Sequence, residues 1–187
     1  MNDSSNIAPK FIEAQPDWSK PVQVISSFRT TVAESRNDGR QRARWRGKPR
    51  YAISYSVSAL TIAESSLRRS QAVGELKAPV VVPVWTDAFT LDAMTSTHVA
   101  DLGESLTKKR FKVGSYAYFV QTGKTSTFRK ITAISGETIT FEAATVPVFT
   151  NGAAVYPCIK GTRQKGSASF TALMIDQTDE AIAVEEL

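Results

Sequence analysis

FKVGSYAYFV, residues Phe111–Val120, decides the fold class of this chain. The stretch is rich in β-branched and aromatic residues, which favour strands. Similar stretches follow at intervals of about ten residues, and pairs typical of tight turns separate them. Strands at this spacing predict a β-sandwich or a small β-barrel. The later strands are expected at Phe128–Ile134, Thr138–Phe141, Ala153–Ile159 and Ser167–Ile175, and the turns at Thr122-Gly123, Ser135-Gly136 and Asn151-Gly152.

The N-terminal half adds further strands and one helix. Val22–Val32 opens with β formers and is expected to be a strand, and alternation over Tyr51–Val57 predicts a half-buried strand. Val80–Trp85 is β-branched and lies between prolines, which suits an edge strand or an extended connection. Helical spacing over Ala59–Val73, with a capping box near its start, predicts the one helix. The expected fold is mainly β: a β-sandwich or small β-barrel with one helix and an extended N-terminal arm.

The same patterns divide the chain into three segments. Residues 1–21 hold three prolines among polar residues, which predicts an extended arm. Phe11 and Trp18 are expected to anchor this arm on a neighbouring surface. Residues 22–175 are predicted to form the β-rich domain, and residues 176–187 an acidic C-terminal tail.

Composition restricts the possible chemistry. The chain has 187 residues and a formal net charge of +5, and its length suits one domain or two small ones. One Cys and one His exclude an intramolecular disulfide and zinc sites built from several Cys or His, so no metal or cofactor is expected. No apolar run approaches the roughly 20 residues of a transmembrane helix, and the polar start lacks the pattern of a signal peptide. No membrane partner is therefore expected.

One segment, called the basic ladder below, carries most of the positive charge. Between residues 36 and 50 the chain has seven cations and one anion, a net charge of +6, whereas the other 172 residues sum to −1. All seven cations occupy even-numbered positions, which lie on one face of a strand. The basic ladder consists of Arg36, Arg40, Arg42, Arg44, Arg46, Lys48 and Arg50.

Three interpretations of the basic ladder compete: a solvated loop, a nucleic-acid contact, and contact with an acidic surface of a neighbouring protein. The third is favoured, because no known nucleic-acid-binding module or aromatic stacking platform accompanies the cations. The chain also supplies an acidic surface, since no cation follows Lys165. Head-to-tail packing of copies and pairing within one subunit both fit this asymmetry. The acidic end contains Asp176, Asp179, Glu180 and the predicted contact residues Glu185 and Glu186.

Catalytic signals are weak. His98 lies among hydroxyl residues, so it could activate a Ser or Thr, but a histidine in a surface turn fits the same sequence. Cys158 lies among apolar residues and is predicted to be a buried small hydrophobe. The chain has no G-x-S-x-G elbow and no spaced pair of carboxylates. The sequence therefore predicts a protein that is not an enzyme.

Four groups of residues, called the landmarks below, occur in a characteristic order. They are Pro16-Asp17-Trp18-Ser19-Lys20-Pro21; then Gly39-Arg40-Gln41-Arg42 leading to Lys48-Pro49-Arg50-Tyr51; then Val82-Pro83-Val84-Trp85; and last Val155-Tyr156-Pro157. This order resembles the minor tail proteins of long-tailed bacteriophages, in particular the distal tail or tail-tip structural proteins. The likeness covers roughly residues 15 to 160.

The resemblance implies a β-rich, non-enzymatic virion protein that is made in the host cytoplasm and used in several copies. Distal tail proteins form a ring in the baseplate that joins the tail tube to the tip. The implied partners are therefore other copies of the chain and the neighbouring tail tube and tail-tip proteins, with nucleic acid an unlikely partner. The alternative function is a nucleic-acid-binding β-barrel protein that uses the basic ladder.

Overall fold

The computed structural model describes residues 8–27, 30–34, 40–44, 50–59, 79–106, 109–144, 148–163, 170–174 and 177–186. Within these residues the chain is mainly β, as the sequence predicts, and no helix occurs. The strands are β1 (Lys10–Phe11), β2 (Gln23–Ser27), β3 (Thr30–Glu34), β4 (Arg40–Arg44), β5 (Arg50–Ala59), β6 (Val80–Pro83), β7 (Phe89–Thr90), β8 (Ala93–Ser96), β9 (Val99–Asp101), β10 (Tyr116–Val120), β11 (Thr127–Ser135), β12 (Thr138–Phe141), β13 (Ala154–Arg163), β14 (Phe170–Met174) and β15 (Gln177–Glu186).

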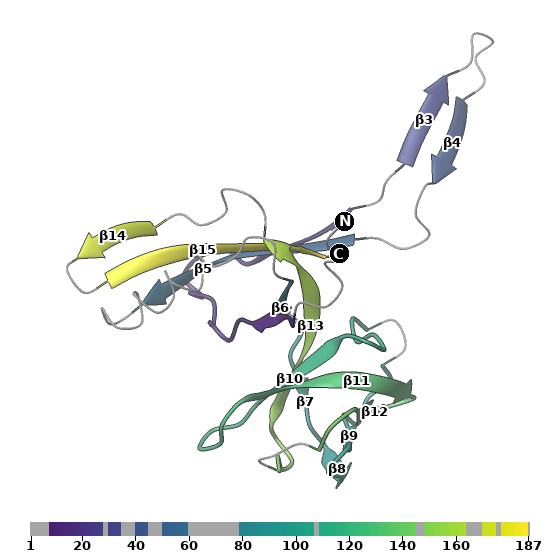
Figure 1. Cartoon of the computed structure of the whole chain (residues 1–187), viewed down its shortest axis with the longest axis vertical. Helices are drawn as coiled ribbons and strands as arrows, with labels where there is room; N and C mark the ends of the chain where they lie inside the picture. The colour runs from purple at the N-terminus through teal and green to yellow at the C-terminus, as the bar shows by residue number, and fades with distance from the viewer. Residues whose placement is uncertain are drawn as a thin grey trace.

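Most of these strands belong to one sheet that curls into a half-barrel (Figure 1). The strand order is β2-β5-β15-β13-β10-β11-β12-β9-β8, and β1, β6, β7 and β14 pair at its sides. Every pair is antiparallel except β1 with β6. Figure 1 shows the long pair β5 and β15 on one side of β13 and the curled part, β7 to β12, on the other. β3 and β4 form a separate small sheet.

β10 and β13 separate two hydrophobic cores, because alternate residues of a strand face opposite sides. On β10, Ala117 and Phe119 belong to the half-barrel core, whereas Tyr118 belongs to the core between β5 and β6. On β13, Val155 belongs to the half-barrel core and Cys158 to the other core. These two strands are therefore the wall that both cores share.

The core between β5 and β6 confirms the alternation predicted for Tyr51–Val57. Ile53, Tyr55 and Val57 are buried in this core, while the residues between them are only half-buried. The Tyr55 hydroxyl donates a hydrogen bond to the carbonyl of Ala14 at 3.3 Å. Residues before β2 therefore take part in the same core.

The half-barrel core is built largely from aromatic rings. Phe119 stacks on Phe149 with ring centroids 5.2 Å apart, and it meets Phe141 edge to face at 5.3 Å. Both arrangements are favourable for aromatic pairs. Because all three rings are buried, Phe119 lies at the centre of this core.

The strands and turns predicted after Phe111 are largely confirmed. The expected strands correspond to β10, β11, β12 and β13. Gly136 closes the β11–β12 hairpin with a φ of 59°, and Gly152 precedes β13 with a φ of 89°. Such positive φ values disfavour any residue with a Cβ atom, which explains why glycine marks both turns.

Three strand assignments differ from the structure. β6 is not an edge strand, because β1 pairs with it on one side and β13 on the other. The strand expected over Val22–Val32 is divided into β2 and β3, which belong to different sheets. β14 is not the last strand, since β15 follows it. In each case the deciding feature is which strands pair, and a period-two pattern within one segment carries no information about its partner.

The predicted N-terminal arm, residues 1–21, packs on the chain's own domain over its described part, residues 8–21. Ile12 is buried, and its N–H donates to the carbonyl of Val81 at 3.0 Å, because an apolar residue in this segment gains from joining the core. The segment predicted as an acidic tail forms β15, which pairs with β5 from Thr178 to Glu185. The predicted helix over Ala59–Val73 lies outside the described residues, apart from Ala59 itself, which ends β5.

We expect Phe119→Ala to lower the free energy of unfolding by about 3–5 kcal/mol, because it leaves a cavity between Phe141 and Phe149. Urea denaturation followed by circular dichroism measures this loss. Val113→Ala is the control, since Val113 is 62% exposed, and its effect should stay within about 0.5 kcal/mol. Equal losses in the two variants would contradict the central position of Phe119.

Candidate interaction surfaces

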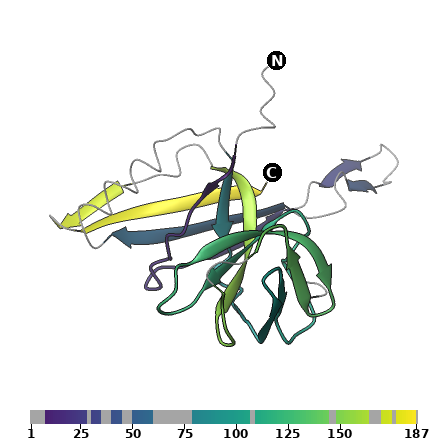
Figure 2. The same cartoon turned by 60° about the horizontal axis from the view of Figure 1, so that its bottom comes forward.

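Part of the basic ladder lies on a hairpin that stands apart from the large sheet (Figures 1 and 2). Arg40, Arg42 and Arg44 occupy alternate positions of β4. Among the described residues, β4 pairs only with β3, and β3 only with β4. The strand expected for the ladder is therefore present at these three positions. The ladder residues outside the described part are Arg36, Arg46 and Lys48.

Along the chain, β3 comes after β2 and β4 comes before β5, but the β3–β4 pair does not continue the register of the β2–β5 pair. The outermost pair of β2 and β5 is Ser27 with Arg50, whereas the nearest pair of β3 and β4 is Thr30 with Arg44. Two residues therefore separate the two ladders on one side and five on the other. β3 and β4 form a sheet separate from the one that contains β2 and β5.

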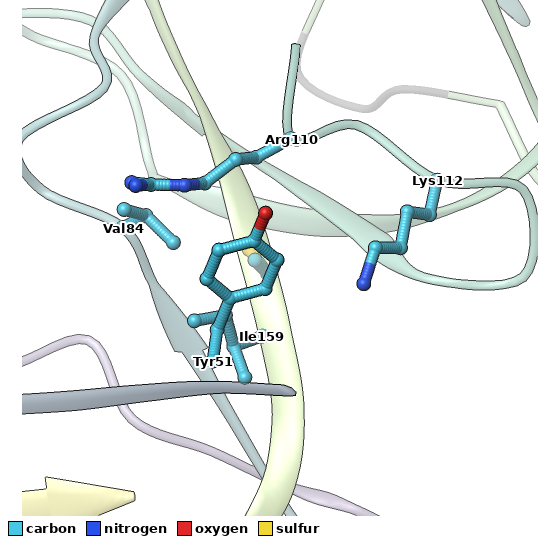
Figure 3. A pocket seen from close by; sticks show the side chains of 6 residues that line it. Tyr51, Val84, Arg110, Lys112 and Ile159 are labelled. Carbon is cyan, nitrogen blue, oxygen red and sulfur yellow. The ribbon is translucent and has the colours of Figure 1, made fainter. Parts of the chain in front are cut away.

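Tyr51, the residue directly after the basic ladder, contacts two cations from a distant loop (Figure 3). Its ring centroid lies 5.2 Å from the guanidinium carbon of Arg110 and 5.3 Å from Nζ of Lys112. Both distances fall in the range of cation–π attraction. The Arg110 guanidinium also donates to the Asp87 carboxylate at 3.0 Å. We call these four residues the Tyr51 clamp; they fasten the start of β5 to the half-barrel.

The Tyr51 clamp is not among the sites predicted from the sequence. A signal was present, since residues 108–112 read KKRFK and form a second basic run. In the structure, Lys109 pairs with Glu104 at 3.0 Å, and Arg110 pairs with Asp87. Carboxylates of the same chain therefore offset the described cations at 109 and 110, which suits a structural link more than a binding surface.

The hollow beside the Tyr51 clamp is small. Its volume is about 10 Å³, which leaves room for one water molecule at most. It is lined by Tyr51, Val84, Arg110, Lys112, Cys158 and Ile159.

The predicted acidic contact residues lie on the strand next to the end of the basic ladder. Glu185 pairs with Ala52 on β5, and Glu186 pairs with Gly161 on β13. Arg50 is two residues from Ala52 along β5, so Arg50 and Glu185 are diagonal neighbours, roughly 7–8 Å apart along the register. One ladder position and the acidic end are thus adjacent within a single chain. The arginines of β4 belong to the other sheet.

The two predicted aromatic anchors have different surroundings. Phe11 is 41% exposed and packs against Tyr116 and Phe128, with ring centroids 5.2 and 4.7 Å apart. It is therefore part of its own chain's surface. Trp18 is 63% exposed and lies in a turn. The carboxylate of Asp17, the residue before it, accepts hydrogen bonds from the N–H and the hydroxyl of Ser19 at 3.0 and 2.7 Å. Trp18 thus keeps the free area that an anchor for a neighbouring protein requires.

His98 and Cys158 lie in different parts of the fold. His98 is in the exposed β8–β9 turn, where Nδ1 lies 3.1 Å from Oγ1 of Thr97. Cys158 is buried, and this burial raises the pKa of its thiol well above the ordinary value. Within the described residues, no three His, Cys, Asp or Glu side chains gather as a metal site would require. That part of the chain also contains no helix long and apolar enough to span a membrane.

We expect the Cys158 thiol to react slowly with a chromogenic disulfide reagent in the folded protein. The thiolate is the reactive form, and burial both hides the sulfur and disfavours its charge. The reaction rate is measured at a pH near the ordinary pKa of cysteine, with and without denaturant. Denaturant should accelerate the reaction strongly, whereas equal rates would contradict the burial of Cys158.

A scan against models of known protein families gives no match to this chain, and a search of curated proteins gives none either.

Proposed function

We propose that this chain is a non-enzymatic structural protein of a bacteriophage virion, a ring-forming distal tail or tail-tip component that joins the tail tube to the tip. Its basic ladder binds carboxylates of a neighbouring copy or of an adjacent tail protein. One observation carries the proposal: Arg40, Arg42 and Arg44 alternate along a hairpin that, among the described residues, pairs with no other strand.

The physics of an isolated hairpin supports a binding role. A two-stranded hairpin is marginally stable in water unless it packs against something else. The charge of the ladder also works against a free hairpin, since like charges in proximity repel. Docking on a carboxylate-rich surface removes both costs. A hairpin with this composition is therefore suited to contact with an acidic partner.

Arginine suits a fixed protein contact. The ladder has six Arg and one Lys, and the planar guanidinium binds a carboxylate through two parallel hydrogen bonds. Exposed ion pairs contribute only about 0–1 kcal/mol each, so several must act together. Alternate positions on one strand present their charges as a row, which a row of carboxylates can match.

The landmarks support the assignment to a tail protein. Two of them pack together, since the Val84 N–H donates to the Pro157 carbonyl at 2.8 Å and the Trp85 and Tyr156 rings lie 5.0 Å apart. These two landmarks therefore lie in one packed unit, and the assignment itself rests on the resemblance in the order of all four.

Nucleic acid is the competing partner, because the same guanidinium groups bind phosphate. Non-specific single-strand binders combine such cations with aromatic rings on which bases stack. Tyr51 is the aromatic residue nearest the ladder among the described residues, and Arg110 and Lys112 already contact its ring. This arrangement favours the protein partner.

We expect the triple variant Arg40→Glu, Arg42→Glu, Arg44→Glu to lose self-assembly, because it sets like charges against an acidic partner. Sedimentation velocity measures the assembly, and circular dichroism checks the fold. The matched control is Lys10→Glu, Lys130→Glu, Lys160→Glu, which makes the same change of net charge on the body and should assemble normally.

Binding to single- and double-stranded DNA distinguishes the two partners. Near the physiological ionic strength of about 0.15 M, the wild type should bind DNA weakly. If it binds DNA at submicromolar concentration there, and the arginine triple variant does not, the protein contact is wrong and the nucleic-acid function replaces it.

A further inference from the structure

Among the strands of the described residues, β2 lies at an edge of the large sheet. Among the described residues it pairs only with β5, through a ladder from Gln23 with Ser54 to Ser27 with Arg50. Its sequence, QVISS, has no charge and no proline. Natural proteins usually blunt such edges with lysine, proline or a bulge, because a free edge accepts another strand. The absence of these devices from β2 suggests that the edge is used.

Exposed apolar side chains lie along this edge. Ile25, at the middle of β2, is 55% exposed. Asp17 donates its N–H to the carbonyl of Ser56 on β5 at 2.8 Å. Ser56 lies two residues beyond Ser54, which pairs with Gln23 at the start of β2. The turn that bears Trp18 therefore lies alongside β5, in line with β2. Two of the five large exposed hydrophobic residues in the described part, Trp18 and Ile25, therefore flank one edge.

The turn that carries Trp18 is held in place before any partner arrives. Oδ1 of Asp17 accepts hydrogen bonds from the N–H and the hydroxyl of Ser19, and the Lys20 N–H donates to the Asp17 carbonyl at 3.0 Å. Because the backbone of this turn is already ordered, binding through Trp18 costs less conformational entropy, which makes this residue an effective anchor.

We propose that β2 binds the edge of a second copy of this chain, with β14 of that copy as the added strand and Trp18 as the anchor beside it. This proposal rests on the proposed function, since it names the sheet edges through which copies join. β14 pairs only with β15 among the described residues, and its sequence, FTALM, is also uncharged. Two uncharged edges add strands without a desolvation cost for ions.

Strand directions favour this partner. The row β2-β5-β15-β14 is antiparallel at each step. Because the row has an even number of strands, β14 of one copy and β2 of the next run in opposite directions when the copies share one orientation. The new pair is then antiparallel, like every other pair in the row. Main-chain hydrogen bonds would continue across the copies, as in strand addition generally.

The contact joins two different edges, β2 of one copy and β14 of the next. Each copy that uses one edge therefore has the other edge available for a further neighbour. Ile25, the middle residue of β2, pairs with Ala52 of β5. Ala172, the middle residue of β14, pairs with Thr178 of β15, which in turn pairs with Ala59 of β5. The edges are therefore offset by about seven strand residues, roughly 23 Å. Such a heterologous contact produces a closed ring or a filament instead of a dimer.

Cross-linking tests the pairing directly. In the double variant Ile25→Cys, Ala172→Cys, a short bismaleimide should join copies into a ladder of dimers, trimers and larger species on a denaturing gel. Each single variant should give no species beyond a dimer. The wild type, whose Cys158 is buried, is the control and should not cross-link. Dimers from Ile25→Cys alone, with no ladder from the double variant, would overturn β14 as the partner.

Ile25→Lys provides the second test. A lysine in the middle of β2 should abolish assembly in sedimentation velocity with little change in melting temperature. Trp18→Ala should weaken assembly. Val148→Lys should not, since Val148 is 51% exposed and adjoins Phe149 of the half-barrel core. If the arginine triple variant loses assembly while Ile25→Lys and Trp18→Ala retain it, the edge proposal is wrong and the proposed function stands. A wild type that stays monomeric at its highest soluble concentration overturns the edge contact, while binding of the hairpin to another tail protein remains open to its own test.

Discussion

The fold depends on β13, and Pro157 is the residue at which this strand changes partners. Ala154–Pro157 pairs with β10, Cys158–Gly161 with β6, and Gly161–Arg163 with β15. Proline has no N–H to donate, so Pro157 cannot make regular ladder hydrogen bonds with the strands on both sides of β13. The Pro157 carbonyl is used, since it accepts the Val84 N–H. This exchange carries one sheet from the half-barrel core to the core between β5 and β6.

Local patterns predicted much of the fold, because the information lies within each segment. Alternation identified the buried face of β5, and glycine pairs identified the turns around β11 and β12. The errors concern pairing between distant segments. Nothing within Val80–Pro83 reveals that Lys10–Phe11 covers its free side, and acidic residues in Gln177–Glu186 obscured a strand that lies between β5 and β13. Burial of a strand is a property of its neighbours as much as of its own residues.

The candidate surfaces divide in the same way. The alternation of arginines at positions 40 to 44 is local, so the strand could be predicted from the sequence. The Tyr51 clamp joins residues about sixty positions apart, and a basic run at 108–112 gives no sign that it packs on Tyr51. The adjacency of Arg50 and Glu185 likewise follows only from the register of β5 with β15. Trp18 was identified by its residue type, whereas its fixed turn depends on Ser56 of β5.

Charge is distributed so that the body and the hairpin would contribute to assembly differently. Ion pairs on the body, such as Lys109 with Glu104, Arg110 with Asp87 and Lys130 with Glu142, offset cations with carboxylates of the same chain. The basic ladder has one anion for seven cations, so its own segment leaves most of its charge without a counter-charge. Salt screens exposed charges over about 8 Å at physiological ionic strength, but it has little effect on main-chain pairing along an uncharged edge. The proposed contact through the hairpin would therefore be sensitive to salt and would select a partner by charge, whereas the proposed contact through β2 would depend on hydrogen bonds and apolar area. With these two surfaces, the chain would recognise a charged neighbour through the hairpin, while the strength of the assembly would come from the β2 edge and not from charge.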